Sequence, residues 1–166
     1  MGVHSTQHRA TFIFTIWIRN LVCIVISGPL SEYPYRWPNK GLRDLKLAVS
    51  LGAIHDSAER YPPPNCHPDT RKAVRQIILD WIHSESLESF FFWLYGPAGA
   101  GKTAICQAIA EFLCSTSGSG QIFGGSFFFS RGKKGRDEGH YLFSTIAYQL
   151  ALKVPGLRQH VTILWN

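Results

Sequence analysis

The eight residues Gly96–Thr103, which read Gly-Pro-Ala-Gly-Ala-Gly-Lys-Thr, constrain the fold of this chain more than any other segment. They match a phosphate-binding loop, in which glycines shape a turn, a lysine reaches the phosphates, and a threonine hydroxyl meets a magnesium ion. Such a loop works between a buried strand and a helix, because its N–H groups must converge at the positive end of that helix.

The residues on either side supply both elements. Phe90–Tyr95 is a short apolar run rich in aromatic residues and predicts a buried strand. Ala104–Leu113 has apolar residues at helical spacing and predicts a helix. We therefore predict that the loop binds ATP or GTP together with Mg²⁺, and that Thr103 is the protein's metal ligand. The predicted nucleotide-binding residues are Gly96, Pro97, Ala98, Gly99, Ala100, Gly101, Lys102, Thr103 and Ala104.

Further elements alternate along the chain in the same way. Val74–Ile82 has one apolar helical face, and Asp69 or Thr70 is the expected N-cap. Ile122–Ser130 predicts a second strand and Tyr141–Lys153 a further helix. Strands that alternate with helices favour a parallel sheet. The predicted fold class is therefore α/β, a partial P-loop NTPase parallel sheet flanked by helices.

The first 51 residues have a different character. Residues 11–30 are strongly apolar, but Arg19 interrupts them, and a charge near the centre of a membrane-spanning helix costs about 2.5–3.5 kcal/mol. The proline-rich stretch Gly28–Lys40 predicts a loop or linker. We therefore expect residues 1–51 to be a leader of uncertain structure without a membrane span, and residues 52–166 to be the N-terminal part of the nucleotide-binding domain.

Net charge and cysteine spacing bear on the expected partners and on the cellular location of the protein. The net charge is +6, but residues 52–166 hold eleven basic and nine acidic residues, so they are nearly balanced. The basic run Arg131–Arg136 contains two glycines and predicts a solvated loop, and nucleic acid is not an expected partner. The four cysteines lack C-x-x-C spacing, which predicts free thiols and a cytoplasmic location.

Four strings in order carry a family resemblance: Cys66–Arg71, Glu88–Tyr95 running into the phosphate loop, Ser126–Arg131 and Thr145–Leu150. Together they resemble the NACHT-type NTPase domains of fungal NOD-like receptor proteins, close to the nephrocystin-type N-terminal domain. The resemblance implies a signalling switch of the STAND class that changes state with its nucleotide. It also implies that the segment around Thr70 and Arg71 lies near the nucleotide base or ribose.

One departure from this family pattern leaves the activity open. Hydrolysis needs an acidic residue at the end of another strand. The resemblance places that strand beyond Thr145–Leu150, and the sequence ends at Asn166 before it. We find no catalytic residue, so binding without hydrolysis is the first expectation. The alternatives are a fragment with Phe127–Phe129 exposed, which acts only by associating with itself or with full-length NACHT proteins, and an autonomous P-loop kinase or ATPase.

Overall fold

The fold was analysed in a computed structural model of the chain. The structure describes residues 11–15, 23–29, 40–67, 69–84, 91–116, 121–153 and 157. The centre of the apolar segment around Arg19, most of the predicted linker and the last nine residues lie outside these ranges.

Three helices follow the apolar spacing of the sequence. Helices α2 (Lys72–His83), α3 (Lys102–Thr116) and α4 (His140–Lys153) confirm the helices expected in these regions. The short helix α1 (Lys40–Leu47) and two 3-10 turns, η1 (Leu51–Ala53) and η2 (Ala58–Arg60), precede them and were not predicted. They are too short for a periodic pattern to stand out against their surroundings.

Four strands form one sheet in the order β3-β1-β2-β4. Strands β1 (Thr11–Thr15) and β2 (Cys23–Pro29) are antiparallel to each other. Strand β1 runs parallel to β3 (Phe91–Phe92), and β2 runs antiparallel to β4 (Gln121–Phe128). Followed through these pairings, β3 and β4 point in the same direction, with the β1–β2 hairpin between them. The sheet therefore contains strands from both sides of the expected domain boundary at residue 51. Strands β1 and β2, which precede residue 51, lie between β3 and β4, which follow it.

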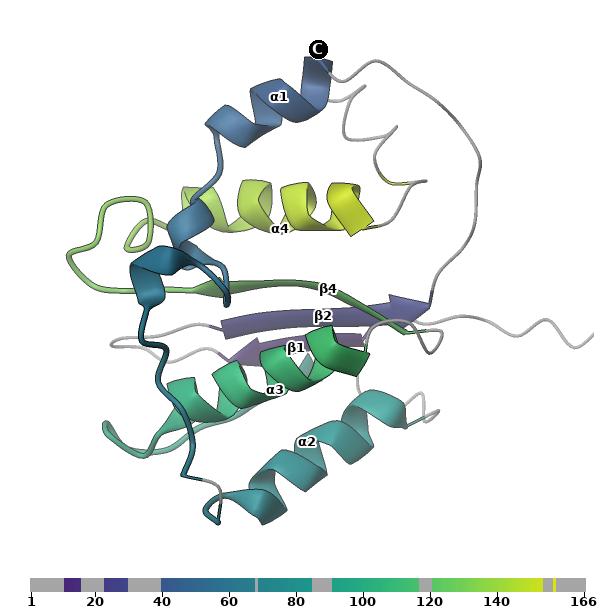
Figure 1. The fold of residues 1–166 in the computed structure, drawn as a ribbon, viewed down its shortest axis with the longest axis vertical. Helices are drawn as coiled ribbons and strands as arrows, with labels where there is room; N and C mark the ends of the chain where they lie inside the picture. Colours follow the sequence, from purple (N-terminus) through teal and green to yellow (C-terminus); the bar gives the residue numbers. More distant parts are fainter. Residues whose placement is uncertain are drawn as a thin grey trace, which may run out of the picture.

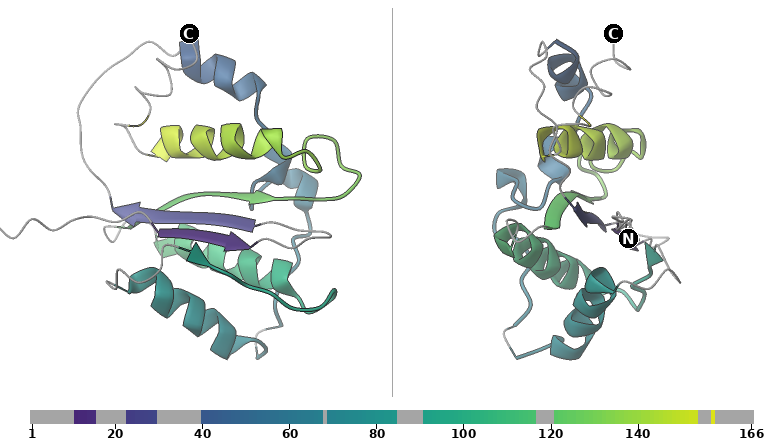
Figure 2. Two further views of the ribbon diagram at one scale, coloured as in Figure 1. Left: turned by 180° about the vertical axis from the view of Figure 1, so that it is seen from behind. Right: turned by 90° about the vertical axis from the view of Figure 1, so that its right-hand side faces the viewer.

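Helices cover both faces of this sheet. Helix α4 lies on one face with α1 beyond it, and α3 and α2 lie on the other face (Figure 1). The views from behind and from the side show the same layers (Figure 2). Within the described residues, no helix is both long and apolar enough to cross a membrane.

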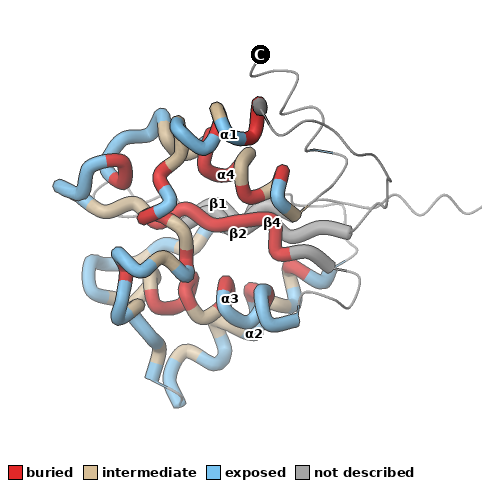
Figure 3. The backbone as a smooth tube through the Cα atoms, turned by 45° about the horizontal axis from the view of Figure 1, so that its top comes forward, coloured by how far each residue is buried: buried red, intermediate tan, exposed pale blue. Residues whose placement is uncertain are grey.

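An irregularity in β4 distributes its aromatic side chains between two cores. Phe123 pairs with Ser27 and Gly125 with Ile26, so Gly124 is an extra residue on β4, a β-bulge. Phe123 and Phe128 consequently share the core formed with α2 and α3, whereas Phe127 belongs to the smaller core formed with α4. The buried strand runs between α4 and α3 in Figure 3. The expectation that Phe127–Phe129 would be exposed is wrong for Phe127 and Phe128, which are 0% exposed because both faces of β4 are covered.

Two further expectations need correction. Residue Arg71, and not Asp69 or Thr70, occupies the N-cap of α2, where it has a left-handed backbone with φ 59° and makes no side-chain cap. The Thr70 hydroxyl instead donates to the carbonyl of His67 at 3.0 Å, and the Asp69 carboxylate pairs with Lys72 at 2.9 Å. The strand expected over Phe90–Tyr95 is only two residues long in β3, and Trp93 and Tyr95 are 52% and 78% exposed.

Candidate functional site

The turn between β3 and α3 contains the phosphate-loop residues, and its glycines have the backbone geometry that such a turn needs. Gly99 and Gly101 have φ values of 78° and 80°, in the left-handed region that side chains disfavour. At Gly101 space is restricted as well, because a Cβ there would lie 2.5 Å from Cζ of Arg71. Glycine at position 101 therefore meets two requirements at once, backbone conformation and close approach.

Lys102 lies folded over this turn. Its Nζ donates to the carbonyls of Gly96 at 2.8 Å and Pro97 at 2.7 Å. The ammonium group is therefore held at the mouth of the loop, where a phosphate group could take the place of the two carbonyls. Charge-assisted hydrogen bonds to phosphate are about twice as strong as neutral ones, so this exchange favours the ligand.

Helix α3 begins directly at the loop. The N–H of Ile105 donates to the carbonyl of Gly101 at 3.0 Å, which closes the first helical turn. Thr103 lies half-buried in that turn, Ala104 is buried behind it, and Pro97, Ala98 and Gly99 are exposed. The predicted residues are thus together at the helix N-terminus, where N–H groups and the positive end of the helix dipole attract an anion.

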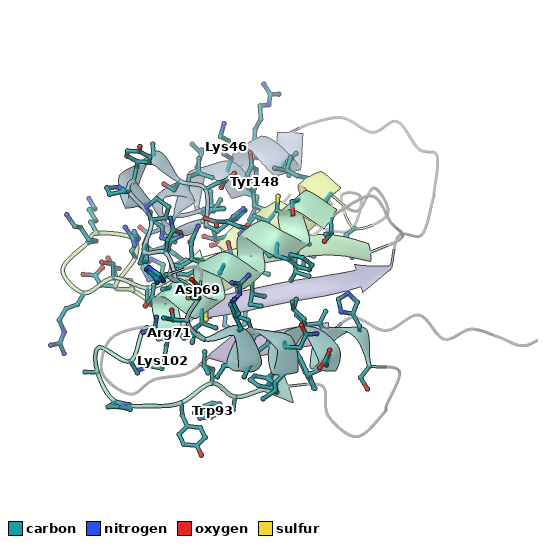
Figure 4. The ribbon with its side chains drawn as sticks, turned by 60° about the horizontal axis from the view of Figure 1, so that its bottom comes forward. Lys46, Asp69, Arg71, Trp93, Lys102 and Tyr148 are labelled. Atoms are coloured by element: carbon teal, nitrogen blue, oxygen red, sulfur yellow. The ribbon has the colours of Figure 1, made fainter. Side chains whose placement is uncertain are left out.

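A second basic side chain reaches the loop from α2. The Nε of Arg71 donates to the carbonyl of Ala100 at 3.2 Å. Asp69, Arg71 and Lys102 lie at the same end of the molecule, whereas Lys46 and Tyr148 lie on the far side with α1 and α4 (Figure 4). Two cationic groups, the guanidinium of Arg71 and the ammonium of Lys102, therefore approach one loop of backbone carbonyls.

The acidic residue that hydrolysis requires has no counterpart at this loop in the described part of the chain. Asp69 is engaged with Lys72 on the surface, and Asp80 accepts from Gln76 on α2. Across the described ranges, no three His, Cys, Asp or Glu side chains form a group that could hold a metal ion. Mg²⁺ is commonly bound by one or two protein ligands together with phosphates and waters, so Thr103 fits that role beside a bound nucleotide.

Sequence reasoning missed a buried polar centre on the next turns of α3. Gln107 is 1% exposed, and its Nε2 donates to the carbonyl of His55 at 3.0 Å and to Glu111 at 2.8 Å. Its Oε1 accepts from Nη1 of Arg60 at 2.7 Å. A glutamine on the apolar face of a predicted helix is the sequence signal that could have identified this centre, because a buried amide requires polar partners.

Burial shifts the ionisation of groups near this centre. Burial lowers the pKa of His55 below its ordinary value, and Lys153 and Arg60 act in the same direction, while Asp56 opposes them. Burial likewise lowers the pKa of Lys153, whose Nζ donates to the carbonyl of Phe123 at 2.7 Å. His55 is therefore a neutral imidazole at neutral pH.

Comparisons with known proteins are consistent with a nucleotide-binding loop. The family model described as "Nephrocystin 3, N-terminal" matches residues 74–166, more than half of the chain. The spermidine/putrescine import ATP-binding protein PotA of Ruegeria pomeroyi is 36% identical over 89 residues, which cover 54% of this chain and 21% of that protein. The chain thus spans about a fifth of the length of this curated relative. No solved structure was found to match the chain.

Proposed function

The chain belongs to the nephrocystin 3 N-terminal family, and on this premise we propose that it binds a purine nucleoside triphosphate with Mg²⁺ through Gly96–Thr103. The observation that carries the proposal is the position of Lys102, whose Nζ bridges the carbonyls of Gly96 and Pro97 at the N-terminus of α3. The ATP-binding description of the bacterial relative supports the same reading.

In this proposal each part of the loop has a defined role. The N–H groups at the start of α3 would donate to a phosphate group, and Lys102 would turn from the two carbonyls to the phosphates. Thr103 would offer its hydroxyl to Mg²⁺, and the ion would supply positive charge against that of the phosphates. The sheet that carries the loop belongs, in this proposal, to the P-loop NTPase class, with β3 and β4 as two of its parallel strands.

We further propose that the domain acts as a switch of the NACHT and STAND type and does not turn nucleotide over rapidly. The contact between Arg71 and Ala100 supports this proposal, because it joins the start of α2 to the phosphate loop. A nucleotide that rearranges the loop would thereby also displace α2. In limited proteolysis of the full chain, Mg²⁺ with ATP or GTP should change the cleavage rate near residues 61–71.

The test of binding is a fluorescence titration of the 166-residue chain with N-methylanthraniloyl derivatives of ATP and GTP in the presence of Mg²⁺. Saturable binding is expected, and Lys102→Ala should weaken it at least about tenfold, because charge-assisted hydrogen bonds are lost. Lys134→Ala is the matched control, since it removes a lysine from the exposed loop after β4. Equal affinities for the wild type and a folded Lys102→Ala variant would overturn the proposal.

A further inference from the structure

A cavity lies along the side of α3, separate from the phosphate loop. Its volume is about 420 Å³, which is within the usual range of small-molecule sites, about 300–1,000 Å³. Segment 55–63 forms one wall, and α3 forms the other through Gln107, Glu111 and Cys114. No residue of Gly96–Thr103 lines it, so a ligand in this cavity would not occupy the phosphate loop.

The charged groups of the lining are both acidic. Asp56 and Glu111 line the cavity, and no lysine or arginine does. Glu111 is oriented by the amide of Gln107, which donates to its Oε1 at 2.8 Å. The nearby guanidinium of Arg60 is directed to the interior, where Nη1 donates to the carbonyl of His55 at 2.9 Å and Cζ lies 3.5 Å from the centre of the Phe128 ring. Lys153, which interacts electrostatically with Asp56, is likewise directed inward, to the carbonyl of Phe123. The charged side chains of the lining itself therefore favour a cation over an anion.

A buried imidazole contributes a polar group to the lining. His55 is 7% exposed, its Nδ1 lies 3.3 Å from the hydroxyl of Ser126, and its ring meets Phe123 edge-on. Among the described residues, none forms a hydrogen bond with its Nε2. Because burial lowers the pKa of His55, the ring adds no positive charge to the two carboxylates. One ring nitrogen of a nine-tenths-buried side chain thus remains for a ligand.

Segment 55–63 also gives the wall an apolar and aromatic part. The cavity is lined there by Ala58, Tyr61 and Pro63. Tyr61 lies at its solvent-facing edge, because this residue is 83% exposed. These side chains offer apolar surface along which the hydrocarbon stem of an amphipathic cation can lie. We propose that the cavity binds a small organic cation, an amine or guanidinium group on a short apolar stem, between Glu111 and Asp56 with the stem against Tyr61 and Pro63.

The same chemistry is found in a free amine and in a lysine side chain of another protein. The full chain, labelled with ¹⁵N, is titrated with n-butylamine, with Nα-acetyl-lysine amide and with uncharged n-butanol, and amide shifts are followed at residues 55–63 and 107–115. Saturable shifts with either cation support the proposal. Tighter binding of n-butylamine identifies a free amine as the source, and tighter binding of the lysine derivative identifies a protein side chain.

Paired variants test the carboxylates. Glu111→Gln keeps an acceptor for Gln107 but removes the charge, and it should weaken cation binding at least about fivefold, as should Asp56→Asn. Asp137→Asn removes an exposed carboxylate that does not line the cavity, and it should leave the affinity unchanged. The proposal is overturned if neither cation binds, if n-butanol binds as tightly as n-butylamine, or if both cavity variants bind the cation as the wild type does.

Discussion

Gly101 shows how a single residue can carry two separate structural demands. Its φ of 80° disfavours any side chain, and the guanidinium of Arg71 occupies the position of a Cβ. The second demand is the weaker one, because a guanidinium is the end of a flexible side chain and can move aside. The destabilisation caused by replacing Gly101 therefore has two parts. The backbone part remains in every variant, and the steric part depends on whether Arg71 moves aside.

Three glycine substitutions separate these costs. Gly101→Ala should lower the free energy of unfolding by about 1–2 kcal/mol through its backbone conformation alone, and by more through displacement of Arg71. Gly132 has a φ of 70°, and a Cβ there would have no atom within 4 Å, so Gly132→Ala should show only the backbone cost. Gly139→Ala, with no atom within 4 Å and no positive φ, should be close to neutral. Urea denaturation of the three variants measures the differences, and equal effects at positions 101 and 139 would contradict the argument.

The pKa of His55 gives a residue-scale prediction about pH. Because burial lowers this pKa in the folded chain, the unfolded chain binds more protons in the interval between the folded and the unfolded pKa. The free energy of unfolding should therefore be highest above the pKa of histidine in the unfolded chain, about 6.5, and should fall as the pH decreases below that value. Urea denaturation between pH 7.5 and 5 should show this loss, and it should be smaller in His55→Asn.

At the scale of elements, β4 is an edge strand whose outer side is satisfied by side chains instead of by another strand. The side-chain amide of Gln149 accepts from the N–H of Ser126 at 3.0 Å and donates to its carbonyl at 2.8 Å. Lys153 donates to the carbonyl of Phe123, and Arg136 to that of Phe128 at 3.4 Å. These contacts occupy backbone groups that would otherwise pair with another chain.

Removing the amide of Gln149 tests this arrangement. Gln149→Leu keeps the side-chain size but leaves a buried N–H and a buried carbonyl of Ser126 without this partner, and it should destabilise the chain by about 2–4 kcal/mol. Amide hydrogen exchange at Ser126 should accelerate accordingly. Leu152→Ala, at a 54% exposed position of the same helix, should change stability by less than about 0.5 kcal/mol. Unchanged exchange at Ser126 in the Gln149→Leu variant would show that the amide does not protect the edge.

At the scale of the whole molecule, the hairpin of β1 and β2 joins the two halves of the sheet. Within the described residues, β3 pairs with β1 through Phe91 and Phe92, whereas β4 pairs with β2 along the whole of β2. Without the hairpin, β3 and β4 would each lose the neighbour that the structure gives them. The hairpin is therefore predicted to be required for a cooperative fold of residues 52–166.

Truncation tests whether residues 52–166 need the hairpin in order to fold or form an independent domain. Residues 52–166 alone should lack a cooperative thermal transition and should aggregate, whereas residues 10–166, which retain β1 and β2, should unfold as the full chain does. Circular dichroism during heating and size-exclusion chromatography provide the measurements. A monomeric, cooperatively folding 52–166 fragment would show instead that the expected boundary at residue 51 separates the leader from the domain.

The sequence predicted what depends on local patterns. The apolar spacing of Ile78 and Ile82 or of Ile105 and Ile109 fixes a helical face within a few residues, so α2 and α3 were predicted, whereas the short α1 was not. The glycines and Lys102 of the loop likewise form one contiguous motif. Non-local relations were not predicted, among them the pairing of β2 with β4, the contact of Gln149 with Ser126, and the cavity between His55 and Glu111. Each joins residues far apart in the sequence, and no short pattern encodes such a partner.

The order of the strands has a consequence for synthesis on the ribosome. The two central strands are translated first, and roughly ninety residues separate Pro29 from Gln121, so at about 5–20 residues per second the hairpin waits roughly 5–20 s for its outer neighbour β4. Until β3 emerges, roughly sixty residues after Pro29, both edges of the hairpin are open to any extended chain nearby, and the edge of β2 stays open until β4 follows. The sheet must therefore grow outward from its centre. Until β4 emerges, the open edge avoids pairing with other chains only if chaperones cover it or if such chains meet it slowly.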